Sequence, residues 1–177
     1  MYKTILAAAM LMTAAISQAA PLSYDYVEGG YGEWDRDDAL FVNGSKALDN
    51  NLFVLGGIYA IDAKANDGFY LEGGVGYHLP MSKQVDLVMS AQLLYGDIGN
   101  NDDMGAILRA GVRFTPADRV ELEGGLAVSS NDTLIDDGVG LDATARYFFS
   151  NAFSGAIGLH SDTELDGVSL SMRYNFR

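Results

Sequence analysis

The amino-acid sequence predicts an all-β protein, an up-and-down antiparallel transmembrane β-barrel. The C-terminal stretch Val168–Phe176 alternates strictly between apolar and polar residues, which is typical of an extended strand with one apolar face. Similar stretches of about ten residues recur along the chain, a length that lets a tilted strand cross a bilayer. Glycine (21 residues), tyrosine (10) and phenylalanine (8) are abundant, whereas proline (3) is scarce. In lipid such strands must close into a barrel, because every backbone polar group needs a partner.

We interpret the first residues as a secretory signal rather than as part of the fold. Lys3 gives a short positive region, and the run from Ile5 to Ile16 is apolar but too short for a membrane-spanning helix. Ser17-Gln18-Ala19 then supplies the small residues of a cleavage site. We therefore expect a signal peptide over residues 1–19 and one barrel domain over residues 20–177.

Composition excludes several classes of function. The formal net charge of −13 argues against nucleic-acid binding and against electrostatic docking on anionic lipid. The chain has no cysteine, which excludes a disulfide scaffold and thiolate metal sites in an exported protein. No motif points to a cofactor or a metal ion, so we expect neither.

Ten strands follow from the alternation and from the turn residues between the alternating stretches. The stretch 39–48 alternates weakly and is counted because the barrel needs an even number of strands. The stretch 52–61 is apolar on both faces, so its orientation is not defined by the pattern. The predicted strands are Tyr24–Trp34, Ala39–Leu48, Leu52–Ile61, Phe69–Leu79, Val85–Tyr95, Met104–Phe114, Val120–Ser129, Gly138–Phe148, Phe153–His160 and Val168–Phe176.

The connections divide into two sets, because successive turns of an up-and-down barrel lie at opposite ends. Short turns are expected at 49–51, 80–84, 115–119 and 149–152. The other set carries most of the aspartates and lies at 35–38, 62–68, 96–103, 130–137 and 161–166. We expect the short turns to face the periplasm and the acidic set to face outside. Bridging of acidic pairs such as Asp136 and Asp137 to lipopolysaccharide phosphates through Ca²⁺ is a further hypothesis.

The same alternation places charged side chains of both signs on the inward faces. The interior of a small barrel is only wide enough for side chains, and buried charges must be paired. We therefore favour a salt-bridged network that fills the lumen, with a charged constriction that selects ions or small solutes as the alternative. The predicted network consists of Glu28, Glu72, Glu121, Glu123, Asp142, Arg109, Arg113, Arg146 and Arg173.

Two shorter patterns carry less information. Glu-Gly-Gly recurs at Glu28, Glu72 and Glu123, but no helix follows to form a phosphate or metal cradle, so we expect these glycines to relieve crowding. His160 and Ser161 invite comparison with barrel hydrolases that trim lipid A, although adjacent strand residues point to opposite faces.

Aromatic residues are expected to form girdles at the two membrane interfaces. The predicted girdle residues are Tyr31, Tyr77, Tyr95, Tyr147, Tyr174 and Phe176.

The opening segment Leu22–Tyr31, the serial amphipathic strands and the terminal Arg173-Tyr174-Asn175-Phe176 resemble the small outer-membrane β-barrel proteins of bacteria, the OmpA-like and OmpX-like barrel group. The resemblance covers the whole mature chain. It implies contact with outer-membrane lipid and lipopolysaccharide, and insertion by the barrel-assembly machinery. Members of that group most often have eight strands, so eight is the alternative to ten, and they end on the aromatic residue, whereas Arg177 follows here.

We therefore expect a non-enzymatic outer-membrane barrel with a filled lumen that contributes to envelope integrity. The alternatives are a narrow porin-like channel, a lipid A-modifying enzyme, and a soluble periplasmic barrel that binds a ligand inside. The directions of Leu108 and Arg109 test the membrane interpretation, because a soluble barrel would turn Leu108 inward.

Overall fold

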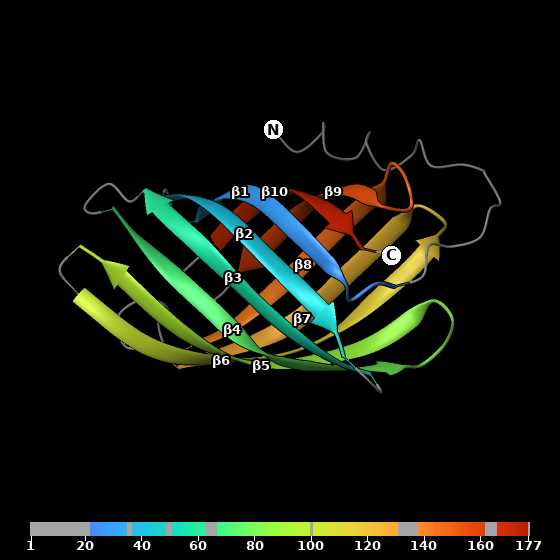
Figure 1. Cartoon of the computed structure of the whole chain (residues 1–177), viewed down its shortest axis with the longest axis horizontal. Coiled ribbons are helices and arrows are strands. Elements are labelled where there is room, and N and C mark those ends of the chain that lie inside the picture. The colour runs from blue at the N-terminus through green and yellow to red at the C-terminus, as the bar shows by residue number, and fades with distance from the viewer. Residues whose placement is uncertain are drawn as a thin grey trace.

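Ten antiparallel strands close into a single barrel in a computed structural model of the chain (Figure 1). Each strand pairs with its neighbours in the sequence, and β1 pairs with β10 to complete the ring. The structure describes residues 22–34, 37–48, 51–62, 67–99, 101–130, 138–161 and 166–176. In those ranges no helix is long and apolar enough to cross a membrane. The predicted signal peptide, Asp136 and Asp137 lie outside the described residues.

The prediction of ten strands is confirmed, and eight is excluded. The strands are β1 (Tyr26–Trp34), β2 (Asp37–Ala47), β3 (Leu52–Asp62), β4 (Asp67–Pro80), β5 (Val85–Ile98), β6 (Asn101–Ala117), β7 (Val120–Ser130), β8 (Gly138–Phe148), β9 (Phe153–Ser161) and β10 (Asp166–Asn175).

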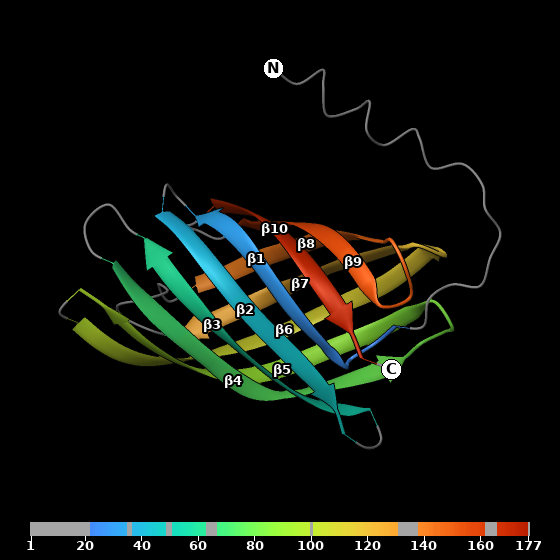
Figure 2. The same cartoon turned by 45° about the horizontal axis from the view of Figure 1, so that its top comes forward.

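The two ends of the barrel differ, because both ends of the described chain lie at the same one. Residues 22–25 and Phe176 lie at one end, together with the turns that follow β2, β4, β6 and β8, and we call it the terminal end. The opposite end, where β1 ends and β2 begins, is the loop end (Figure 2). Asn51, in the turn after β2, has a φ of 72°, a left-handed conformation that asparagine tolerates and that fits the predicted tight turn.

Strand β6 is longer than predicted at both ends. At the loop end its extension pairs with β5, where Ile98 lies opposite Asn101. At the terminal end the prediction of a turn over 115–119 is wrong, because β6 continues to Ala117. A register shift against β7 between Phe114 and Ala117 accommodates Pro116, which has no N–H to donate to the ladder.

Side-chain direction follows the inside-out pattern that a bilayer requires. Leu108 points outward and is 60% exposed, whereas its neighbour Arg109 lies in the lumen, 3.7 Å from Glu72. Leu170 and Met172 of the closing strand are likewise exposed. A continuous apolar outer surface of this kind is stable in lipid and not in water.

The aromatic residues expected to form girdles all lie on the outer surface. Tyr77, Tyr147 and Tyr174 lie near the terminal end of their strands, and Tyr31 and Tyr95 lie near the loop end. At the terminal end the rings contact one another, with the centroids of Tyr174 and Phe176 5.2 Å apart. These positions match the two interfacial belts of a membrane barrel.

Each Glu-Gly-Gly repeat has the same structural role. The second glycine of each repeat faces inward, where a Cβ would meet a carbonyl oxygen of the neighbouring strand. A Cβ would lie 2.5 Å from the Leu170 oxygen at Gly30 and 2.8 Å from the Ala110 oxygen at Gly125, and at Gly74 it would overlap the Ala91 oxygen. Strands approach so closely there that a side chain would force them apart, which supports the interpretation of the repeats as relief of crowding.

We expect Leu108→Arg to lower the free energy of unfolding in lipid vesicles by about 2–4 kcal/mol, because it places a guanidinium near the bilayer midplane. Met104→Arg, on the same face near the loop end of β6, is the matched control and should cost about 0–1 kcal/mol. Urea titration followed by tryptophan fluorescence measures both. Equal costs at the two positions would contradict the assigned membrane depth.

Candidate functional site in the lumen

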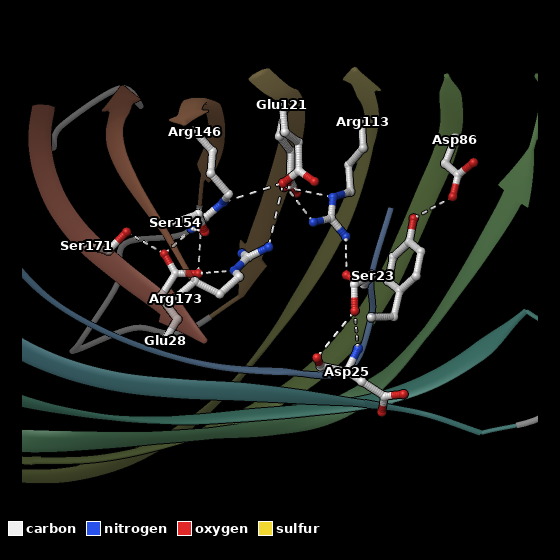
Figure 3. Close-up of polar contacts among 12 residues, drawn as sticks. Ser23, Asp25, Glu28, Asp86, Arg113, Glu121, Arg146, Ser154, Ser171 and Arg173 are labelled. Atoms are coloured by element: carbon white, nitrogen blue, oxygen red, sulfur yellow. Dashed lines mark hydrogen bonds and ion pairs between the residues drawn. The ribbon is translucent and has the colours of Figure 1, made fainter. Parts of the chain in front are cut away.

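Glu28 on β1 is the centre of a buried group of ion pairs at the terminal end of the lumen (Figure 3). Arg146 Nη2 donates to its two carboxylate oxygens at 2.8 and 2.9 Å, and Arg173 Nε donates to Oε2 at 2.6 Å. The Ser171 hydroxyl donates to Oε1. All three charged side chains are less than a tenth exposed. Charge-assisted hydrogen bonds of this geometry are what makes buried charges tolerable.

Glu121 on β7 extends this group across the lumen. Arg113 Nη2 donates to Glu121 Oε1 at 2.8 Å, and the same oxygen lies 3.5 Å from Arg146 Nε and 3.6 Å from Arg173 Nη1. Glu123 Oε2 lies 3.4 Å from Arg113 Nε. Three carboxylates and three guanidiniums therefore balance one another. We call this group the ion-pair layer: Glu28, Glu121, Glu123, Arg113, Arg146 and Arg173.

Tyr24 fills the part of the lumen beside the ion-pair layer. Its ring stacks on His78 of β4 at 4.1 Å and on Phe53 of β3 at 4.9 Å. Its hydroxyl donates to Asp86 of β5 at 2.9 Å, and burial raises the pKa of the Tyr24 phenol, so the group remains a neutral donor. The sequence pattern predicts Tyr24 as the start of a strand, which is wrong, because β1 begins at Tyr26 and Tyr24 precedes it.

The segment before β1 is held in place by contacts on both sides. Arg113 Nη1 donates to the Ser23 carbonyl at 3.3 Å, and the Arg113 guanidinium lies over the Tyr24 ring, 4.8 Å from its centroid. Asp25 lies 2.8 Å from Lys46 Nζ and accepts from the Ala47 N–H at 3.0 Å. The bond to Lys46 lowers the pKa of Asp25, so this anchor is present at neutral pH. The segment and the ion-pair layer are joined through Arg113, which contacts both.

A second, more open set of charged groups lies farther toward the loop end. Arg109 Nη1 lies 3.7 Å from Glu72 and Arg109 Nε lies 3.9 Å from Asp142, distances too long for hydrogen bonds. Tyr59 donates to Glu72 at 3.1 Å, and His160 Nδ1 lies 2.6 Å from Asp142. The side chains of Arg109 and Asp142 are each 37% exposed. The structure thus places all nine residues of the predicted lumen network in ion pairs, in two groups.

His160 and Ser161 do not form a catalytic pair. His160 faces the lumen and contacts Asp142, whereas Ser161 is exposed on the opposite face of β9. Because a nucleophile and its base must lie within hydrogen-bond reach, this arrangement gives no support to a lipid A hydrolase built on these two residues. Among the residues that the structure describes, no group of three or more His, Asp or Glu side chains is placed to hold a metal ion.

The sequence analysis missed an aromatic wall on the opposite side of the lumen. The ring of Trp34 meets Phe41 at 6.5 Å, Phe41 stacks on Tyr59 at 5.6 Å, and Tyr59 stacks on Tyr70 at 4.1 Å. These residues come from β1, β2, β3 and β4. Each of these four strands contributes one ring. The alternation in β2 and β3 does not show that Phe41 and Tyr59 point inward, because both faces of these strands carry apolar residues.

A cavity of about 290 Å³ lies between the aromatic wall and the charged side chains of β6, β7 and β8. It extends along the lumen from the ion-pair layer to Trp34 at the loop end of β1. Its lining includes Trp34, Phe41, Tyr59, Arg109, Glu123 and Asp142.

Solved structures with the same fold are known, although no protein-family model matches the sequence and no curated protein matches it. The KdgM porin in complex with disordered oligogalacturonate has a TM-score of 0.56, with 8% identity over 86% of this chain and 99% of that chain. The KdgM porin without that ligand gives a TM-score of 0.55, also with 8% identity and the same coverage. The chain has the fold of outer-membrane β-barrel proteins. At 8% identity, the similarity to these two structures shows a shared arrangement of strands and nothing more.

Glu28→Gln should lower the free energy of unfolding by about 3–5 kcal/mol, because Arg146 and Arg173 would lose their shared buried carboxylate. Glu123→Gln is the matched control. The Glu123 side chain is 42% exposed, so its loss should cost about 1 kcal/mol or less. Urea unfolding in detergent micelles, with heat-modifiable gel migration as the folding check, measures the difference. An equal loss of unfolding free energy in the two variants would contradict the burial of Glu28 between Arg146 and Arg173.

Proposed function

We propose that the protein is an integral outer-membrane barrel without enzymatic activity, closed at its terminal end, that contributes to envelope integrity. The ion-pair layer is the observation that carries this proposal. A solute crossing the lumen would have to separate Glu28 from Arg146 and Arg173 or displace Tyr24. Separating these charges would leave each of them buried without its partner, which disfavours the open state.

The location in the outer membrane is supported by the fold and by the apolar outer surface between two aromatic belts. We propose that the terminal end faces the periplasm, since both ends of the barrel chain and the short turns lie there. The acidic loop end would then lie among lipopolysaccharide headgroups. Insertion by the barrel-assembly machinery and export through a cleaved signal peptide complete the proposal.

A narrow channel is the second candidate, and the cavity favours it. The cavity extends along much of the lumen, and the Arg109, Glu123 and Asp142 side chains that line it are partly exposed. The KdgM porin, which shares the fold, is described in complex with oligogalacturonate, an acidic oligosaccharide. That ligand does not carry over here, because carboxylates and guanidiniums line this cavity in equal numbers.

Single-channel recording in planar bilayers separates the two candidates. We expect no steady openings from the native barrel and openings from Tyr24→Ala, because the Tyr24 ring fills the lumen between β3 and β5. Tyr31→Ala, the same change on the outer face, is the control and should stay closed. Steady openings of the native protein that Arg109→Ala or Glu123→Ala alters would favour the channel.

We also expect the mass spectrum of lipid A to be identical from cells with and without the protein. A changed acyl or phosphate pattern would contradict the absence of enzymatic activity.

A further inference from the structure

We propose that the cavity in the lumen is a binding site for one small organic cation of the ammonium type. This inference goes beyond the proposed function, and it holds for a closed lumen as well as for a conducting one. It rests on the charges that remain accessible in the cavity, on the aromatic wall, and on one buried amide that lacks a donor.

The accessible charges in the cavity are mainly negative. Most charged groups of the ion-pair layer are buried and paired with one another. The partly exposed carboxylates are Glu123 at 42% and Asp142 at 37%, and they face one partly exposed guanidinium, that of Arg109. His160 Nδ1 lies 2.6 Å from Asp142 Oδ1, but Arg109 makes no hydrogen bond to Asp142 Oδ2 at 3.9 Å, so this second oxygen keeps acceptor capacity for a ligand. Glu123 keeps such capacity as well, because its closest guanidinium contact is the 3.4 Å approach of Arg113 Nε to Oε2.

The aromatic wall provides the second element of cation recognition. Trp34 and Phe41 line the same cavity as the two carboxylates, next to Tyr59, whose ring is stacked between Phe41 and Tyr70. Aromatic faces attract cations through the ring quadrupole, and they do so more strongly where water is excluded. This lumen already uses that interaction internally, because the Arg173 guanidinium lies over the Tyr26 ring, 3.7 Å from its centroid.

The side chain of Gln92 on β5 indicates that the ligand carries hydrogen-bond donors. Its side chain lines the cavity, and the residue is only 3% exposed. Its Nε2 donates to Ser90 at 3.1 Å, but within the described ranges its Oε1 accepts no hydrogen bond. A buried acceptor without a donor is costly, so a ligand that carries N–H or O–H donors would stabilise a rotation of the Gln92 amide toward the cavity.

The size of the cavity agrees with a small cation. A cavity of 290 Å³ is just below the range of about 300–1,000 Å³ for small-molecule sites, so it holds one small molecule rather than a polymer.

Tryptophan fluorescence tests the proposal directly, because Trp34 is the single tryptophan of the chain and lines the cavity. The full barrel in detergent is titrated with choline at constant ionic strength. We expect a saturable change in the Trp34 emission. The neutral tert-butyl isostere of choline, which has the same shape without the charge, should give none, and galacturonate should give none.

Two carboxylate variants and a control locate the site. Glu123→Gln and Asp142→Asn should each weaken choline binding about five- to tenfold, whereas Asp67→Asn on the outer face should leave the affinity unchanged. Heat-modifiable migration checks folding. If Asp142→Asn does not fold, the better exposed Glu123 decides the question. The absence of a saturable response to choline, an equal response to the isostere, or full affinity in Glu123→Gln overturns the proposal.

Discussion

The interior of the barrel depends on the pairing of Glu28 with Arg173. The two residues lie directly opposite each other on β1 and β10, the strands whose pairing closes the ring. A bilayer turns the apolar faces outward, so the polar faces of ten strands meet in the lumen, where charges are stable only if they are paired. Arg146 of β8 joins the same carboxylate, so the seam of the barrel is also tied to a strand that β9 separates from β10.

The alternation of residues was sufficient to predict most of the architecture. In strands such as β6 and β10, one face is apolar and the other is polar, so a period of two identifies both the strand and its orientation. The inward direction of the nine charged lumen residues is predicted by the same alternation. The ends of the strands are not predicted by it, because they depend on how far the neighbouring strand extends and on the register shift at Pro116.

The aromatic wall and the role of Tyr24 could not be predicted, for different physical reasons. On β2 and β3 both faces are apolar, since the lumen on that side is filled by rings such as Phe41 and Phe53, and alternation then carries no information about direction. Tyr24 donates to Asp86, which is 62 residues away in the sequence. No local pattern encodes a contact of that separation.

The position of Tyr24 has a consequence for how the barrel is completed. Between residues 23 and 28, the start of the barrel contacts β3, β4, β5, β6, β8 and β10. These residues precede all of those strands in the sequence, so their full set of partners is present only when almost every later strand is in place. The first segment of the barrel therefore acquires its native surroundings late, and the second edge of β1 is paired only when β10 joins it.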